Sequence, residues 1–254
     1  MSGTKIAVRV EGLVKQFHGN GYETSLFSNL TLTVHEGEFV AITGANGSGK
    51  TTLLNIIAGL DRPSSGQVHV FGQDLSNLTD GQLAQFRMEK MGIIPQRIVF
   101  RKCGFMSNPT AVFLQDCGFI SNLTVIENVK QPLLISKKSD SESGEKAFKI
   151  LELLGVSKKV DCFPLQLSVG EMRKVAIARA LITEPSILLL DEPTEDLDSH
   201  TLNVFLPLLR GLHYLHGRTI LMATNRRRIA KLAGREVHLG RPKLVHSQPL
   251  KMEA

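Results

Sequence analysis

The chain has 254 residues, of which 42% are hydrophobic and 21% charged, and 30 lysines and arginines outnumber 24 aspartates and glutamates by a net charge of +6. These values are ordinary for a globular domain and exclude a disordered, collagenous or coiled-coil chain. The small positive excess, the low aromatic share of 6% and the absence of tryptophan argue against nucleic acid as a partner.

The sequence also bears on the cellular compartment. The first twelve residues lack the apolar core of a secretory signal, and no apolar run approaches the roughly 20 residues that span a bilayer. Cys103, Cys117 and Cys162 lack metal-ligand spacing, and an odd number of cysteines fits a reducing compartment. We therefore expect a cytoplasmic chain that does not cross the membrane.

Apolar segments alternate with amphipathic helical patterns along the chain, which is typical of an α/β domain with a largely parallel sheet. Residues 6–10 and 30–34 alternate apolar and polar, and this predicts two half-buried strands that are antiparallel or peripheral. Residues 39–42 predict a strand and residues 50–60 the helix that follows it. A glycine-rich turn separates this strand from its helix.

The middle of the chain is predicted to contain several helices. Amphipathic patterns predict helices over 80–91 and 145–154, with a short strand at 92–94 after the first. A serine- and lysine-rich turn at 136–143 precedes the second helix. Gly155 stands where a glycine commonly ends a helix.

We divide the chain into a single domain, residues 1–246, and a C-terminal tail, residues 247–254. Within the domain, about 85–165 is the expected helical subdomain. It contains a local repeat, because CGFMSNPTAV at 103–112 recurs as CGFISNLTVI at 117–126. The repeat is too short for a solenoid and indicates a tandem duplication that lengthened one loop.

The glycine-rich turn reads GANGSGKT and fits the phosphate-loop pattern G-x-x-x-x-G-K-[ST] at every fixed position. In such a loop the glycines let several backbone N–H groups point at an anion, and the following helix presents its positive end to it. The residues expected to bind a nucleotide here are Gly44, Asn46, Gly47, Ser48, Gly49, Lys50, Thr51 and Thr52.

Two of these side chains suit a nucleoside triphosphate with magnesium. Lys50 would bring a mobile positive charge to the β and γ phosphates. Thr51 would offer its hydroxyl to Mg²⁺, which prefers oxygen ligands. A purely structural glycine turn would not need either residue.

An acidic pair follows the apolar run at 186–190. Such a run is typical of a parallel strand covered on both faces, and ligands bind at the carboxyl ends of these strands. Asp191 therefore suits the shell of the metal, and Glu192 suits orienting or deprotonating an attacking water. Without the phosphate loop, a solvated strand end would explain the pair equally well.

The segment LSVGE at 167–171, which we call the signature segment, opens another helix, and Ser168 and Glu171 have the spacing of a capping box. A capping box alone is common. Together with the following VAIARAL and ILLLDEPT, however, the segment resembles the ATP-binding cassette (ABC) ATPases. The resemblance runs from about residue 6 to 245. It implies a phosphate-loop NTPase core with a mostly parallel sheet, an antiparallel β subdomain, a helical subdomain, and ATP with Mg²⁺ as cofactors.

The resemblance also implies a second copy of the chain as a partner. In this family two cassettes close face to face, and the signature serine and glycine bind the γ-phosphate held by the other copy. Ser168 and Gly170 take these positions here, and Glu171 of the same segment is also expected to bind the nucleotide. Phe17 stands where an aromatic residue stacks on adenine, with a core aromatic as the alternative. Asp198 falls in the loop that links the two sites across the dimer interface.

Three segments resemble one branch of the family, which serves lipoprotein release, macrolide export and cell division. They are GLDRPSSG at 59–66, FRMEKMGIIPQ at 86–96 and LTVIENVKQPLL at 123–134. The branch implies an ATP-hydrolysing subunit at the cytoplasmic face of the cell membrane, which drives an integral membrane permease in lipoprotein release or export of a hydrophobic substrate. The alternative is a nucleotide-gated regulatory subunit with low turnover that signals to a cell-wall partner.

Three positions depart from the family pattern. Asn225 stands where a histidine usually touches the γ-phosphate, and its amide can donate a hydrogen bond but carries no charge. Val169 replaces the first glycine of the signature segment.

The glutamine that contacts metal and water in this family is either Gln96, at a strand end, or Gln115, at the usual distance from Glu127. We prefer Gln96 because the sheet fixes the position of a residue at a strand end. The added chain, which contains the repeat, would then bulge toward the helical subdomain, where the membrane partner docks in this family.

Overall fold

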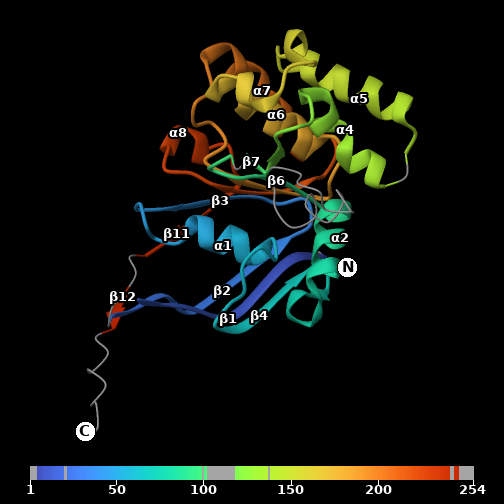
Figure 1. Cartoon of the computed structure of the whole chain (residues 1–254). Helices are drawn as coiled ribbons and strands as arrows, with labels where there is room; N and C mark the ends of the chain where they lie inside the picture. Colours follow the sequence, from blue (N-terminus) through green and yellow to red (C-terminus); the bar gives the residue numbers. More distant parts are fainter. Residues whose placement is uncertain are drawn as a thin grey trace, which may run out of the picture.

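The structure is a computed structural model that describes residues 5–19, 22–98, 100–101, 118–136, 138–240 and 243–245. Over these ranges, two five-stranded sheets and the helices packed on them form the body of the molecule (Figure 1). Most of the duplicated segment, together with Cys103, Cys117, Gln115 and the tail at 247–254, lies outside the described residues.

The first sheet is antiparallel and has the strand order β12-β2-β1-β4-β5. Its strands are β1 (Ile6–Gly19), β2 (Tyr22–His35), β4 (Ser65–Val70), β5 (Gln73–Asp74) and β12 (Lys243–Val245). Val8 lies opposite Val34 and Val10 opposite Leu32. The two predicted strands near the start are therefore confirmed, and both are longer than their alternating patterns.

The second sheet is parallel throughout and has the order β11-β3-β10-β9-β6. Its strands are β3 (Phe39–Gly44), β6 (Met91–Ile94), β9 (Ile187–Asp191), β10 (Thr219–Ala223) and β11 (Arg235–Leu239). A short parallel pair, β7 (Phe100–Arg101) and β8 (Phe119–Ile120), stands apart.

The burial of β9 on both of its faces explains its continuous apolar run. Ile187 and Leu189 pack into the core on one side of the parallel sheet, and Leu188 and Leu190 pack into the core on the other side. Successive side chains of a strand point to opposite faces, so a strand covered on both faces is apolar at every position. The predicted α/β class with a mostly parallel sheet is confirmed.

Helix α1 (Lys50–Ile57) lies between the two sheets (Figure 1). Its Leu53, Leu54 and Ile57 are buried in the same core as Val8 and Val10 of β1. Its first turn is thereby fixed at the carboxyl edge of β3, where the phosphate loop begins.

Helix α2 (Asp80–Lys90) packs into the same core as α1. The core on the opposite face of the parallel sheet holds side chains of α4 (Val125–Ile135), α5 (Asp140–Leu153), α6 (Val169–Leu181) and α7 (Ser199–Tyr214). The short helix α8 (Arg227–Ala230) follows β10. Single 3-10 turns are η1 (Leu75–Asn77), η2 (Ser157–Lys159) and η3 (Pro164–Gln166). In the described part of the chain, every helix is too short or too polar to cross a bilayer.

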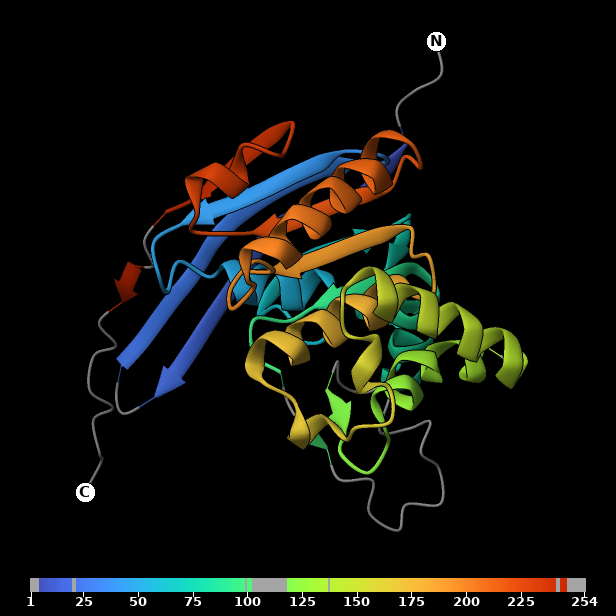
Figure 2. The ribbon, with the colours of Figure 1, turned by 90° about the horizontal axis from the view of Figure 1, so that it is seen from above.

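Helices α4 and α5 project at the side of the molecule away from the antiparallel strands (Figure 2, green to yellow against blue). The expected helical subdomain at about 85–165 needs a corrected start. β6 pairs with β9 in the parallel sheet, and Leu83 of α2 packs in the core that holds α1, so α2 and β6 belong to the main body. The projecting helices begin with α4.

The start of α5 also differs from its prediction. Ser139 caps the helix through a hydrogen bond from the Glu142 N–H, so the polar stretch predicted as a turn up to residue 143 already contains the first helical turn. At the other end, Gly155 follows the cap residue Leu154 and has φ +67°, which confirms its helix-ending role.

Candidate functional site

The phosphate loop joins β3 to α1 as predicted, in a backbone conformation that depends on glycine. Gly47 and Gly49 have φ of 79° and 97°, in the left-handed region. A Cβ atom added to Gly49 would lie 2.7 Å from the Phe27 ring. Gly49 is also the N-cap of α1, and no side chain of the described residues caps this helix. The N-terminus of α1 is therefore left to attract an anion.

Two side chains complete the loop as a set of donors. Lys50 is 7% exposed, and its Nζ donates to the carbonyl oxygens of Gly44 at 3.1 Å and Ala45 at 3.3 Å. The Ser48 Oγ is buried and has no hydrogen-bond partner within the described chain. Backbone amides, an ammonium group and an unsatisfied hydroxyl fit the oxygens of a polyphosphate.

Asp191 ends β9 and is only 5% exposed. Burial raises the pKa of Asp191, and this rise is opposed by the Thr51 hydroxyl and the charge of Lys50. Its Oδ1 finds no hydrogen-bond donor among the residues that the structure describes. A buried carboxylate oxygen without a donor, opposite a threonine hydroxyl, is a donor set that suits a hard cation such as Mg²⁺.

Glu192 is held in a fixed orientation by the end of the neighbouring strand. Its Oε1 accepts the Asn225 backbone N–H at 2.7 Å, and its Oε2 accepts the Thr224 hydroxyl at 3.1 Å. Its φ is +44°, a value that is strained for a non-glycine residue. Burial raises the pKa of Glu192, and the two hydrogen bonds lower it in part. Sequence reasoning did not single out Thr224, whose position directly before Asn225 was the available signal.

Gln96 and Asn225 approach the same region from two different strands. Gln96 follows β6, and its Nε2 donates to Glu195 Oε2 at 3.3 Å. Asn225 follows β10, and its Nδ2 donates to Asn46 Oδ1 at 2.6 Å. The Asn225 amide thereby connects the end of β10 to the phosphate loop.

The three residues predicted to hold the metal all line one cavity. Its volume is about 540 Å³, and Thr51, Gln96 and Asp191 all form part of its wall. They come from α1, from the loop after β6 and from the end of β9. Parallel strands that end at the same edge bring them together, as expected for ligand sites in α/β sheets.

The signature segment forms a complete helix cap. The Ser168 hydroxyl accepts the Glu171 N–H at 3.3 Å, and the Glu171 carboxylate accepts the Ser168 N–H at 2.8 Å and its hydroxyl at 2.9 Å. These bonds from Ser168 hold the pKa of Glu171 below its usual value. The predicted capping box is confirmed. The described residues that line the cavity do not include Ser168 or Gly170.

Asp198 and Phe17 lie away from the cavity. Asp198 caps α7 by accepting the Thr201 N–H at 2.8 Å, and this bond, with the nearby Lys174, holds the pKa of Asp198 well below its usual range. Phe17 is 47% exposed on β1, with Lys15 Nζ 5.2 Å from its ring centroid. The alternative that Phe17 is a core aromatic is therefore wrong.

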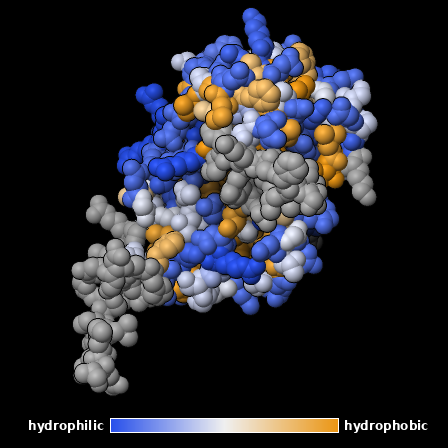
Figure 3. Space-filling model, in the orientation of Figure 1, coloured by the Kyte–Doolittle hydropathy of each residue, from blue (hydrophilic) through white to orange (hydrophobic). Residues whose placement is uncertain are grey.

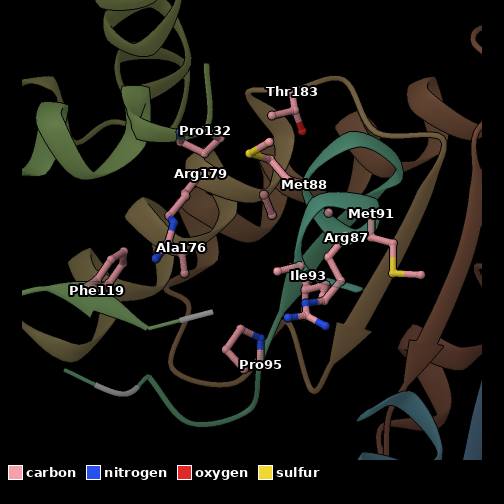
Figure 4. Close-up of a pocket in the computed structure, with 13 residues that line it drawn as sticks. Arg87, Met88, Met91, Ile93, Pro95, Phe119, Pro132, Ala176, Arg179 and Thr183 are labelled. Carbon is pink, nitrogen blue, oxygen red and sulfur yellow. The ribbon is translucent and has the colours of Figure 1, made fainter. Parts of the chain in front are cut away.

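An apolar pocket lies between α2 and β6 on one side and α4 and α6 on the other (Figure 4). Met88, Ile93, Phe119 and Pro132 form much of its wall, and Arg179 lines the α6 side next to the Phe119 ring. Apolar side chains also show on the outer surface of the upper helices, among hydrophilic ones (Figure 3). Between α5 and the start of α6, the exposed large apolar residues are Phe148, Leu153, Phe163, Leu165 and Val169.

Comparison with known proteins agrees with this arrangement. A family model described as ABC transporter matches residues 27–195, which is more than half of the chain. The chain belongs to the ABC transporter family. The cassette is 36% identical over 234 residues to the macrolide export ATP-binding/permease protein MacB of Rhodopirellula baltica. The match covers 91% of the cassette and 31% of the relative, so the chain spans about a third of that protein's length.

Two solved structures resemble the cassette over nearly its full length. One is a dimeric, post-hydrolysis state of the ATP-binding cassette MJ0796 bound to ADP and Pi, and the other is a dimeric structure of MJ0796, described as a bacterial ABC transporter cassette. Both are 30% identical with a TM-score of 0.81, and they cover 96% and 95% of the cassette and 100% of their own chains. The resemblance inferred from the motifs is therefore confirmed, together with the fold.

Proposed function

We propose that the cassette binds ATP with Mg²⁺, hydrolyses it as a homodimer and thereby powers an integral membrane permease. The observation that carries this proposal is the shared cavity, where Thr51, Gln96 and Asp191 converge beside the phosphate loop. Glu192 follows Asp191 in the chain and has its carboxylate fixed. Binding, metal coordination and water activation therefore have candidate groups at one edge of the sheet.

The proposed roles follow from the chemistry of each group. The loop from Gly44 to Thr52 binds the phosphates with its amides and with Lys50. Thr51, Gln96 and Asp191 hold Mg²⁺, which when bound neutralises phosphate charge and orients the phosphate oxygens. Glu192 accepts a proton from the attacking water, and its raised pKa brings it closer to the operating pH.

The γ-phosphate contact differs from that of a histidine. The amide of Asn225 donates a hydrogen bond but supplies no charge at any working pH. Charge-assisted hydrogen bonds are about twice as strong as neutral ones. We therefore expect hydrolysis by the cassette to be slower than in relatives that carry the histidine.

The second half of each nucleotide site is proposed to come from a second copy. Ser168 and Gly170 lie at the N-terminus of α6, which can bind an anion, and they do not line the cavity of their own chain. The exposed ring of Phe17 is free of the core and is proposed to stack on adenine. Asp198 lies at the start of α7, in the loop proposed to connect the two sites. The similar MJ0796 structures are both dimers.

ATPase assays and dimerisation assays test this proposal. We expect magnesium-dependent ATP hydrolysis that disappears in Lys50→Ala and falls by about 10²- to 10⁴-fold in Glu192→Gln. Glu192→Gln should still bind ATP and should elute as a dimer with ATP and as a monomer without it. A wild-type chain that neither takes up ATP with Mg²⁺ nor dimerises as Glu192→Gln would overturn the proposal.

The proposed permease docks at the apolar pocket between α2 and α4, and the cassette then works at the cytoplasmic face of the membrane. The similarity to a macrolide export ATP-binding/permease protein supports export of a hydrophobic substrate or release of lipoproteins. The inserted chain between β7 and β8, which lies outside the described residues, is proposed to contact this partner. Purification of the tagged chain from detergent-solubilised membranes should recover the permease. Deletion of residues 103–116 should weaken that recovery and the coupled ATPase activity.

A second candidate function is a nucleotide-gated regulatory subunit that signals to a cell-wall partner with little turnover. Asn225 is the observation that favours it, because its neutral amide predicts slow hydrolysis. Turnover measured with the membrane partner present separates the two. Stimulation by the partner supports transport, and ATP-dependent dimerisation with no stimulation supports regulation.

A further inference from the structure

A buried arginine in α6 binds the loop that carries Gln96. Arg173 is 2% exposed, and its guanidinium donates to the carbonyl oxygens of Pro95 at 2.6 Å and Gln96 at 2.7 Å. Both distances are at the short end for hydrogen bonds of this kind, as charge-assisted bonds are. Two consecutive carbonyl oxygens thus share one planar guanidinium.

The two carbonyls are the principal partners of this charge. Within the described residues, Asp196 is the carboxylate that pairs with it, and it stays at 4.0 Å, the limit for an ion pair. The Arg173 Nε is buried without a partner in that part of the chain. A buried cation needs hydrogen-bonded partners, so the guanidinium and the loop hold each other in place.

The neighbouring residue shows that this contact is specific. Lys174 is also on α6, but its Nζ lies 3.2 Å from Asp198, at the start of α7. Arg173 is directed instead to the loop after β6, which is 77 residues earlier in the chain. A flat guanidinium can bond two adjacent carbonyl oxygens at once, whereas the ammonium of a lysine is a single point charge.

The position of Arg173 connects both halves of the proposed nucleotide site. It lies one helical turn after Val169, at the end of α6 that carries Ser168 and Gly170. Arg173 donates a hydrogen bond to the backbone carbonyl of Gln96, and Gln96 lines the cavity with Thr51 and Asp191. Any shift of the start of α6 relative to the parallel sheet therefore moves or releases the Gln96 loop.

We propose that Arg173 is a positioning residue that holds Gln96 at the metal site and makes its placement depend on the position of α6. The inference rests on the proposed function and adds to it a physical link from the signature segment to the metal. Closure of a second copy on Ser168 would act on Gln96 through this guanidinium.

Arg173→Met and Arg173→Lys test the link in the full chain, with Arg235→Met as the matched control. Arg235 also donates to a backbone carbonyl, that of Thr33 at 2.7 Å, but it does so next to Glu38, away from the cavity. We expect Arg173→Met to lower kcat by about 10- to 100-fold, with the KM for ATP within about twofold of wild type. The Mg²⁺ concentration for half-maximal activity should rise. Arg173→Lys should be intermediate, and Arg235→Met should match the wild type in all three values.

A second readout does not depend on turnover. In the Glu192→Gln background with ATP present, Mn²⁺ binding followed by electron paramagnetic resonance should weaken when Arg173→Met is added. A folded Arg173→Met chain with wild-type kcat, Mg²⁺ dependence and Mn²⁺ binding would overturn the inference. If Arg173→Met does not fold, wild-type values in Arg173→Lys would overturn it as well.

The same measurements separate this inference from the proposed function. A wild-type chain with no more ATPase activity than Lys50→Ala would contradict hydrolysis, and Mn²⁺ binding would still test the Arg173 link. A wild-type chain that binds no Mn²⁺ with ATP would overturn both.

Discussion

The phosphate loop and the signature segment each lead into the N-terminus of a helix, but they differ in how their polar groups are satisfied. At the loop, the Ser48 Oγ and the Asp191 Oδ1 are buried without partners in the described structure. At the signature segment, the Ser168 and Glu171 side chains bond each other, and Ser168 is exposed. The first helix N-terminus has buried polar atoms that are ready for a ligand. At the second, the Ser168 hydroxyl would have to give up its bond to Glu171 to reach a phosphate in the proposed dimer.

The largest effect is expected from a substitution that distorts the phosphate loop. Gly49→Ala places a Cβ 2.7 Å from the Phe27 ring at a residue with φ +97°. Strain and displacement of the loop should weaken ATP binding by about 100-fold or more, measured by fluorescence of a labelled nucleotide. Gly211→Ala is the control, because a Cβ on this α7 glycine meets open space. Equal ATP binding by the two variants would show that the conformation of the phosphate loop is not fixed before the nucleotide binds.

An intermediate effect is expected from a substitution in the signature segment, whose side chains bond each other. Ser168→Ala removes the cap of α6 and should destabilise the chain by about 1 kcal/mol. Nucleotide binding by the monomer should stay within about twofold, since Ser168 is not part of the cavity wall. ATP-driven dimerisation of the Glu192→Gln chain should weaken by about tenfold, measured by analytical ultracentrifugation. A monomer that loses ATP binding as strongly as it loses dimerisation would contradict the division between the two ends.

The smallest expected effect concerns pH. The Thr201 N–H and Lys174 depress the pKa of Asp198 in the folded chain, so its ionised form adds stability above its unfolded pKa of about 4. That stability is lost as the pH falls toward the lowered folded value. Urea unfolding of wild type and Asp198→Asn should therefore show a constant difference from pH 7 to 5 and a narrowing one below about pH 4. A difference that widens on acidification would contradict the depressed pKa.

Sequence reasoning selected residues that lie close together in the structure, because the motif residues stand at the ends of strands and helices. The apolar run of β9 placed Asp191 at an edge, and a parallel sheet brings such edges together. The preference for Gln96 rested on the same argument, and the structure places Gln96 on the cavity wall. Gln115, the other candidate, lies outside the described residues.

What sequence reasoning missed depends on contacts between distant segments or on conflicting local signals. Thr224 and Arg173 act on residues 32 and 77 positions away, and no periodicity encodes such contacts. Helix α4 was not predicted. Pro132 lies inside it and disfavours a helix, whereas Thr124 and Glu127 form a capping box at its start. The early part of the expected helical subdomain belongs to the sheet because β6 pairs with β9, which only the tertiary fold decides.

The bond between Asn225 and Asn46 joins the end of β10 to the phosphate loop, two segments 179 residues apart in the chain. In the resting cassette the Asn225 amide is therefore already engaged. An amide nitrogen has two N–H donors, so the proposed contact with a γ-phosphate can use one of them while the other keeps its bond to Asn46. The phosphate loop would then hold the Asn225 side chain in one orientation before the nucleotide arrives, which lowers the entropy that the contact costs.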